Sequence, residues 1–137
     1  METIENEYAR FWFENGVLFS ELKEPIEFDV KIVSNLIELR HKISNSTNQY
    51  WCMDGTKLVS LNKEARDYAE IHGQDFIYAN AMIVNSHVTK FIFCMYVKLK
   101  SPGFPFQVFT NREKAVEWLL EIKSKNEEKI ENERIGK

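Results

Sequence analysis

Cysteine is scarce in this sequence of 137 residues, which contains only Cys52 and Cys94. The two cysteines are far apart in the chain, and each lies in a strongly apolar stretch. This placement favours two buried free thiols over a disulfide or a metal site. Free thiols suit the reducing cytoplasm, so we expect a cytoplasmic protein that holds no metal.

Long hydrophobic runs and an excess of positive charge are also missing. No stretch approaches the roughly 18 apolar residues of a membrane span, and residues 1–7 are acidic and polar, unlike a signal peptide. The 18 Lys and Arg residues are outnumbered by 21 Asp and Glu residues, which gives a net charge of −3. No basic face with interleaved aromatic residues is present. The sequence therefore predicts neither a membrane span nor nucleic-acid binding.

Motifs that carry catalysis or bind cofactors are absent as well. The sequence has no Gly-rich phosphate loop, no paired-cysteine motif and no histidine pair at metal-binding spacing. His41, His72 and His87 fall on the outer ends of three different predicted helices, so none provides a base for a nucleophile. We expect a non-enzymatic protein without a cofactor.

The sequence does contain a regular succession of strand-like and helix-like segments. Its length fits one domain, which we place at residues 1–124, followed by a charged tail at residues 125–137. Because the tail is almost wholly charged, we expect it to fray into solvent.

The first predicted element is a β-hairpin. Residues 8–14 alternate apolar and polar side chains, which is the period of a half-buried strand. Asn15 and Gly16 tolerate the positive φ angles of a type I′ turn. We therefore expect residues 17–22 to return as the second strand.

A helix is predicted next, with Asp29 at its cap or in its first turn. Apolar residues then recur at the spacing i, i+4, i+7 and i+11, so that they share one face. The predicted buried stripe consists of Ile32, Leu36, Leu39 and Ile43.

The centre of the chain predicts a buried strand, a loop and a capped helix in succession. Residues 50–53 form an apolar run without charge, which is typical of a strand covered on both faces. Asp54 and Gly55 end this strand. Asn62 is placed to cap the next helix, and Gly73 to end it in the left-handed conformation.

Two further strand-and-helix units complete the chain. Residues 79–84 predict an inner strand, and residues 87–100 a helix that is apolar around nearly its whole circumference. Residues 106–109 predict the last strand, and Thr110 with Glu113 a capping box that opens the last helix. The predicted buried stripe of that helix consists of Ala115, Trp118, Leu119 and Ile122.

The predicted order is therefore ββαβαβαβα. Strands that alternate with helices imply right-handed crossovers and parallel pairing, and the opening hairpin adds one antiparallel neighbour. The fold class that we predict is α/β, with a mainly parallel five-stranded sheet, an N-terminal β-hairpin and four helices.

A docking site is expected in the loop after the central strand, because such loops lie at the carboxyl edge of an open α/β sheet. The candidates are Asp54, Thr56, Ser60, Asn62 and Lys63. A phosphate on Thr56 or Ser60 would gain the amides and the dipole of a nearby helix N-terminus. The plainer alternatives are that both hydroxyls satisfy local backbone and that Asp54 bonds the amides of Gly55 and Thr56 in a turn.

The apolar helix at residues 87–100 has more apolar surface than one face of a sheet can cover. We expect Phe93 and Tyr96 to face the partner in a two-fold homodimer. Phe104 and Phe106 either form an exposed apolar lip beside this helix or pack in the core against the last helix. The helix and these two residues are alternatively suited to line a pocket for an apolar ligand.

With these elements in place, the sequence resembles the STAS fold, the class of the anti-sigma-factor antagonists of sporulation and stress signalling. It is more closely similar to a family of small bacterial STAS-like proteins without assigned function. The matching segments are residues 11–18, 53–55, 62–68, 106–111 and 114–119. The resemblance implies a bacterial protein that acts by docking to another protein.

The resemblance fails at one functional position. In the antagonists an Asp-Ser pair opens the second helix, and that serine is the phosphorylation switch. Asn62 and Lys63 stand at this place here, so the switch serine is not carried over and Ser60 is only a nearby hydroxyl. We therefore expect a non-enzymatic protein-interaction or regulatory module with an unknown protein partner. The alternative is a protein of related fold that binds an apolar small molecule or a lipid.

Overall fold

The computed structural model of this chain describes residues 2–87, 89–90, 94 and 102–136. At its centre is a six-stranded sheet in the order β1-β2-β3-β5-β7-β8. Its strands are β1 (Thr3–Glu5), β2 (Ala9–Glu14), β3 (Val17–Leu22), β5 (Gln49–Asp54), β7 (Ile77–Ile83) and β8 (Phe106–Phe109). A separate two-stranded sheet consists of β4 (Ile26–Phe28) and β6 (Leu58–Leu61).

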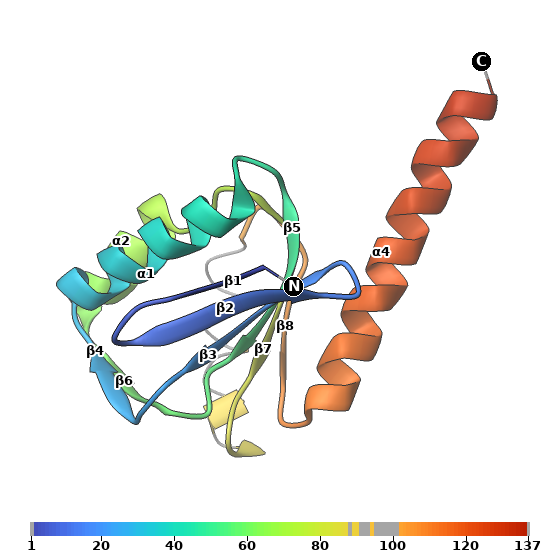
Figure 1. The fold of residues 1–137 in the computed structure, drawn as a ribbon. Coiled ribbons are helices and arrows are strands. Elements are labelled where there is room, and N and C mark those ends of the chain that lie inside the picture. Colours follow the sequence, from blue (N-terminus) through green and yellow to red (C-terminus); the bar gives the residue numbers. More distant parts are fainter. Residues whose placement is uncertain (1, 88, 91–93, 95–101, 137) are drawn as a thin grey trace.

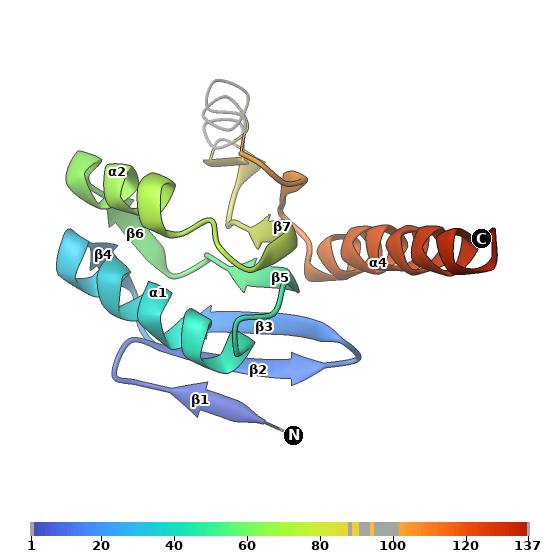
Figure 2. The same ribbon diagram turned by 90° about the horizontal axis from the view of Figure 1, so that it is seen from above.

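Helices cover both faces of the six-stranded sheet. The described helices are α1 (Val30–Ser44), α2 (Lys63–His72) and α4 (Arg112–Ile135). Figure 1 shows α1 and α2 on one face of the sheet and α4 on the other, so the domain has three layers. Figure 2, the same ribbon seen from above, shows α4 extending well beyond the sheet.

All five predicted strands are present in the large sheet, but the sheet is mixed rather than mainly parallel. The β1–β2 and β2–β3 pairs are antiparallel, whereas β3–β5, β5–β7 and β7–β8 are parallel. The sequence analysis missed the short strands β1, β4 and β6, although it predicted β8, which also has four residues. A pattern over three or four residues is too short to distinguish a strand from a loop. The described residues contain three helices instead of the predicted four, since most of the helix expected at residues 87–100 lies outside them.

The predicted hairpin is confirmed in both pairing and turn type. Glu14 pairs with Val17, and the two turn residues between them have positive φ angles, 53° at Asn15 and 78° at Gly16. These angles are those of a type I′ turn, whose twist matches the twist of the flanking strands.

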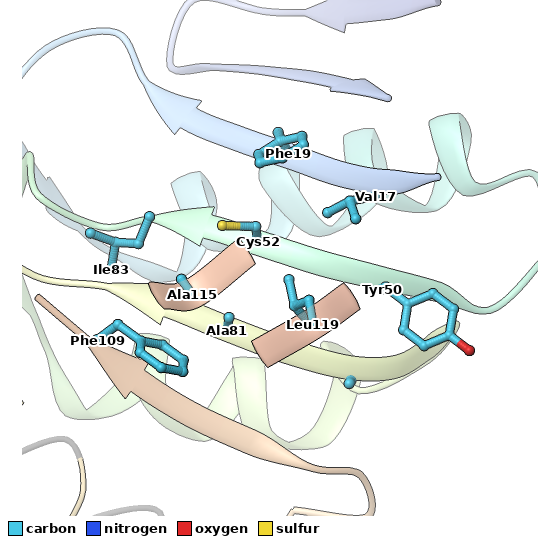
Figure 3. Close-up of a cluster of buried hydrophobic side chains, with 10 residues drawn as sticks. Val17, Phe19, Tyr50, Cys52, Ala81, Ile83, Phe109, Ala115 and Leu119 are labelled. Carbon is cyan, nitrogen blue, oxygen red and sulfur yellow. The ribbon is translucent and has the colours of Figure 1, made fainter. Parts of the chain in front are cut away.

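The core under α4 is built from alternate side chains of the sheet. Figure 3 shows this cluster, which includes Val17, Phe19, Tyr50, Cys52, Ala81, Ile83, Phe109, Ala115 and Leu119. The alanines of β7 and α4 are fully buried, so the helix approaches the sheet closely. The predicted stripe of this helix is confirmed, because Trp118 and Ile122 pack against the same cluster.

The core on the opposite face lies under α1 and α2. Phe11 and Leu18 of the hairpin meet Ile43 of α1 and Ala65 of α2 there. The predicted α1 stripe is confirmed, since Ile32, Leu36 and Leu39 join this cluster as well. Both faces of β5 are therefore covered, as its apolar sequence predicted.

Two predicted helix caps are confirmed, whereas the predictions for the start of α4 and for the end of α2 are wrong. Asp29 Oδ1 accepts a hydrogen bond from the amide of Ile32 (2.9 Å), and Asn62 Oδ1 accepts one from Ala65 (2.8 Å). At the start of α4 the cap is Asn111, not Thr110, so the predicted capping box is wrong. The residue that ends α2, Gly73, has a φ of −99° and is not left-handed.

Two further expectations fail, one for the burial of Cys94 and one for the charged tail. Cys52 is buried, but Cys94 is exposed, because apolar neighbours in sequence bury a residue only where another element covers it. The tail that was expected to fray continues as part of α4 up to Ile135. Ion pairs one helical turn apart, such as Lys125 with Glu121 at 3.0 Å, stabilise this exposed helix.

Candidate functional site

An apolar pocket of about 250 Å³ lies between the six-stranded sheet and the helices α1 and α2. The sheet contributes Phe11, Trp51 and Met82, and α1 contributes Leu36 and Ile37. Further lining residues come from the segment before β8 and its first residue, namely Pro102, Phe104 and Phe106. Such a concave, mostly apolar cavity is the usual form of a small-molecule site.

Small residues on α2 explain why this layer leaves a cavity. The face of α2 that points to the sheet carries Ala65 and Ala69, and the helix ends at Gly73. Ala69 and Gly73 line the pocket. Ala69 and Gly73 occupy little volume, so space is left beside them between α2 and the sheet.

Arg40 is the only charged side chain that is buried in the described part of the chain, with 1% of its surface exposed. It lines the pocket from α1. Its guanidinium donates hydrogen bonds to the carbonyl oxygens of Asp75 (2.9 Å) and Gly73 (3.0 Å). The Gly73 bond satisfies a carbonyl at the end of α2 that has no partner within the helix.

The environment of Arg40 disfavours its charge. Burial lowers the pKa of Arg40 to about 10, and the charge of the exposed Asp75 opposes this shift. A pKa of about 10 still leaves the guanidinium protonated at neutral pH. Its carbon lies 4.7 Å from the centre of the Trp51 ring, a cation–π contact. The pocket therefore contains a buried positive charge held by carbonyl dipoles and an aromatic face.

Two polar side chains flank Trp51 on the same face of the sheet. Ser20 Oγ accepts a hydrogen bond of 2.9 Å from Trp51 Nε1. On the other side, Asn80 of β7 pairs in register with Trp51 and is 6% exposed. Its Oδ1 atom is buried and has no hydrogen-bond partner within the described residues. Ser20 and Asn80 line the pocket together with Trp51.

Asp54, the acid expected to matter at the end of β5, is mainly a turn residue. Its Oδ1 accepts hydrogen bonds from the amide (2.9 Å) and the hydroxyl (2.6 Å) of Thr56. The amide of Gly55 donates to Ile83 instead, so the predicted turn bonding is confirmed only for Thr56. Oδ2 of Asp54 forms an ion pair with Arg112 at 3.2 Å. The side chain also reaches the rim of the pocket.

The remaining docking-loop candidates are spread over two elements. Ser60 is exposed and belongs to β6, where it pairs with Glu27, so it lies in a strand rather than in a loop. Asn62 serves as the cap of α2, and the exposed Lys63 forms an ion pair with Asp67 at 3.0 Å.

Of the four residues predicted to form an apolar contact or pocket, the structure describes two. Phe104 and Phe106 are half-buried and line the pocket. Phe106 packs against the cluster of Met82, Val84 and Val108, so the prediction that it packs against the last helix is wrong. Phe93 and Tyr96, and with them the surface expected to form a homodimer, lie outside the described residues.

Sequence reasoning missed Arg40, Ser20 and Asn80. A signal was present for two of them, because Arg40 stands four residues after Leu36 on the apolar stripe of α1, and Asn80 interrupts the apolar run of β7. Polar residues at inward positions of this kind are retained where they have a partner or a role.

Neither a membrane-spanning helix nor a cluster of metal ligands occurs among the described residues. None of their helices is long and apolar enough to cross a membrane. No group of three or more His, Cys, Asp or Glu side chains in this part of the chain is arranged to hold a metal ion.

The fold places the chain in the SpoIIAA-like class of α/β proteins. One similar solved structure is the crystal structure of an uncharacterized protein from the DUF3478 family with a SpoIIAA-like fold, from Shewanella loihica PV-4. The two chains are 13% identical, the match covers 87% of this chain and 99% of the other, and the TM-score is 0.59. This likeness concerns the fold alone, and it confirms the resemblance to the STAS fold.

The chain belongs to the family described as domain of unknown function DUF7793, whose model matches residues 11–123. No curated protein matches the sequence.

Proposed function

We propose that this protein is a non-enzymatic, cytoplasmic STAS-like module that binds an apolar small molecule between the sheet and the helices α1 and α2. The pocket of about 250 Å³ is the observation that carries this proposal. An engineered apolar cavity of about 150 Å³ already takes benzene, and pockets for larger ligands begin at about 300 Å³. The volume therefore suits a ligand of intermediate size.

The polar groups of the pocket support binding rather than turnover. Ser20, the only hydroxyl among the described lining residues, bonds to the indole of Trp51 and not to a base. The ring of His41 contacts Phe76 and Arg40, and the ring of His72 lies 4.4 Å from that of Tyr68. A nucleophile next to a base, the usual mark of covalent catalysis, is not formed by these residues.

Two measurements on purified native protein test the proposal. Organic extraction followed by mass spectrometry is expected to recover an apolar compound in stoichiometric amount, or else the empty protein should bind the neutral dye Nile red. Ala69→Trp, which fills the pocket from α2, should abolish dye binding. The matched control is Leu120→Trp on the exposed side of α4, which should leave binding unchanged.

Two results would contradict the proposal. The first is a native protein that carries no apolar compound and binds no dye. The second is dye binding that persists unchanged in Ala69→Trp, because the dye would then occupy another surface.

Docking to a protein partner is the second candidate function, and the resemblance to the SpoIIAA-like fold supports it. Val59 of β6, between Thr56 and Asn62, is 61% exposed and provides a probe of this surface. A single exposed apolar side chain is ordinary on a monomer, so the test rests on partner recovery and not on the exposure itself. Val59→Asp should abolish recovery of a partner with the tagged protein, whereas Ile130→Asp, at an exposed site of α4, should not. Equal recovery with both variants would exclude this surface.

A further inference from the structure

The pocket is not uniformly apolar, because its buried polar groups gather around one residue. Trp51 lies at the centre of this group, with Arg40 over its ring, Ser20 bonded to its indole N–H and Asn80 beside it on β7. The other charged lining residues, Glu21, Asp54, Arg66 and Glu70, are exposed or half-buried. The pocket therefore has a polar end that is shielded from solvent and an apolar remainder.

Arg40 has hydrogen-bonding capacity beyond its role in holding the backbone. A guanidinium has five N–H groups, and the carbonyls of Gly73 and Asp75 accept from two of them. Nη2 also lies 3.5 Å from Nε2 of His41. No carboxylate of the described residues forms an ion pair with Arg40. A buried cation that forms no ion pair with the described carboxylates, and whose charge is offset in part by the exposed Asp75, favours an anionic group on the ligand.

Asn80 places a second requirement on the head group of the ligand. Its Oδ1 atom is a hydrogen-bond acceptor that is buried and without a partner in the described part of the structure. A buried acceptor left without a donor is costly, so a water or a ligand group is expected to satisfy Oδ1 of Asn80, which lines the pocket. The ligand group that satisfies Oδ1 must be a donor, as a hydroxyl is and a carboxylate is not.

We propose that the ligand is an apolar chain whose head carries a carboxylate and a neighbouring hydroxyl, with the carboxylate at Arg40 and the hydroxyl at Asn80. This inference rests on the proposed function, because it assigns the polar end of the same pocket. The apolar chain lies against Leu36, Met82 and Phe106. Hydroxylated medium-chain fatty acids are the simplest compounds of this class.

Three ligands of equal chain length distinguish the contribution of the carboxylate contact from that of the hydroxyl contact. The native protein should bind 3-hydroxydecanoate more tightly than decanoate, and decanoate about tenfold or more tightly than 1-decanol, as measured by displacement of Nile red. A factor of about ten is the lower end of what a hydrogen bond to a charged group contributes.

Asn80→Leu tests the hydroxyl contact without endangering the fold. Leucine is close in size and removes the unpartnered acceptor, so the variant should be as stable as the native protein or more stable. It should bind 3-hydroxydecanoate and decanoate equally, and it should still prefer decanoate to 1-decanol. A variant that kept the hydroxyl preference would overturn the role of Asn80.

Arg40→Met tests the carboxylate contact. This variant also loses the bonds to Gly73 and Asp75 and is expected to be less stable, so the measured quantity is the ratio of the dissociation constants of decanoate and 1-decanol. Partial unfolding cancels in that ratio. The ratio should fall to about one in Arg40→Met and be retained in part in Arg40→Lys, which keeps the charge.

Different results would contradict the head-group assignment and the proposed function. Equal binding of decanoate and 1-decanol by the native protein would overturn the head-group assignment and leave the pocket in place. Binding of neither compound, together with no binding of Nile red, would contradict the pocket itself.

Discussion

Asn126 Nδ2 donates a hydrogen bond of 3.1 Å to the hydroxyl of Tyr50, although the two residues are 76 positions apart in the chain. This bond joins the middle of α4 to the start of β5. Beyond it, residues 127–136 are all exposed. The docked part of α4 therefore ends near Asn126, well short of the end of the helix at Ile135.

Removal of residues 128–137 should leave the domain intact, because these residues bury no side chain in the part that the structure describes. We expect Tm to change by no more than about 2 °C, since surface segments contribute little to stability. The helical signal in circular dichroism should decrease. A longer deletion that also removes Asn126 should lower Tm clearly, and equal effects of the two deletions would contradict this boundary.

Leu119→Ala should reduce the free energy of unfolding by about 2–5 kcal/mol, because the side chain is fully buried under the sheet and its loss leaves a cavity. The neighbouring Leu120 is 39% exposed and provides a matched control. Leu120→Ala is expected to cost less than about 1 kcal/mol. Urea titration followed by tryptophan fluorescence measures both, and a similar loss in the two variants would be inconsistent with the assigned face of α4.

Asn111→Ala should cost about 1 kcal/mol, because Asn111 Oδ1 accepts the amide of Lys114 (3.1 Å) at the first turn of α4. Thr110→Ala should have almost no effect, since Thr110 is exposed and does not cap the helix. Thermal unfolding of the two variants decides between the capping box expected from the sequence and the cap seen in the structure. A larger loss at Thr110 would restore the capping box.

Cys52 should be unreactive toward iodoacetamide at pH 8, because burial raises the pKa of its thiol to about 11 and the thiolate is the reactive form. Cys94 is exposed and should be alkylated under the same conditions. Mass spectrometry of the labelled protein distinguishes one modification from two. In denaturant both thiols should react, and fast labelling of Cys52 in the folded protein would contradict its burial.

The same shift predicts a loss of stability in alkali. The folded thiol keeps its proton up to a pKa of about 11, whereas the unfolded thiol loses it near its ordinary value of 9.0. The folded state therefore binds more protons between these values, and stability falls by about 1 kcal/mol per pH unit there. More than about one pH unit below 9.0 the group has almost no effect, because the thiol is protonated in both states. Cys52→Ala should show a shallower decline over this range, and an unchanged slope would show that other groups cause it.

Ser60 and Thr56 should not carry stoichiometric phosphate in the native protein. Asn62 and Lys63 occupy the place of the switch pair, Ser60 lies in β6, and the Thr56 hydroxyl is bonded to Asp54. Phosphopeptide analysis of protein purified from its natural source measures the modification directly. Stoichiometric phosphate on either residue would restore a regulated antagonist.

The sequence by itself determined the elements whose signals are local. The turn at Asn15 and Gly16 depends on two adjacent φ angles, and the caps at Asp29 and Asn62 depend on residues at most three positions away. The first hairpin strand and the stripes of α1 and α4 were found from periodicity, because a period is visible within one element. The central strand was found from its unbroken apolar run.

Tertiary structure decided the pocket and its polar end. Residues 31 to 35 positions apart form the contacts that matter, namely Trp51 with Ser20 and Arg40 with Gly73 and Asp75. A polar residue in an apolar stripe signals that some partner exists, but only the packing of α1 and α2 on the sheet shows which groups meet. The volume left between those layers depends on all the side chains that face it at once, so no local pattern in the sequence contains it.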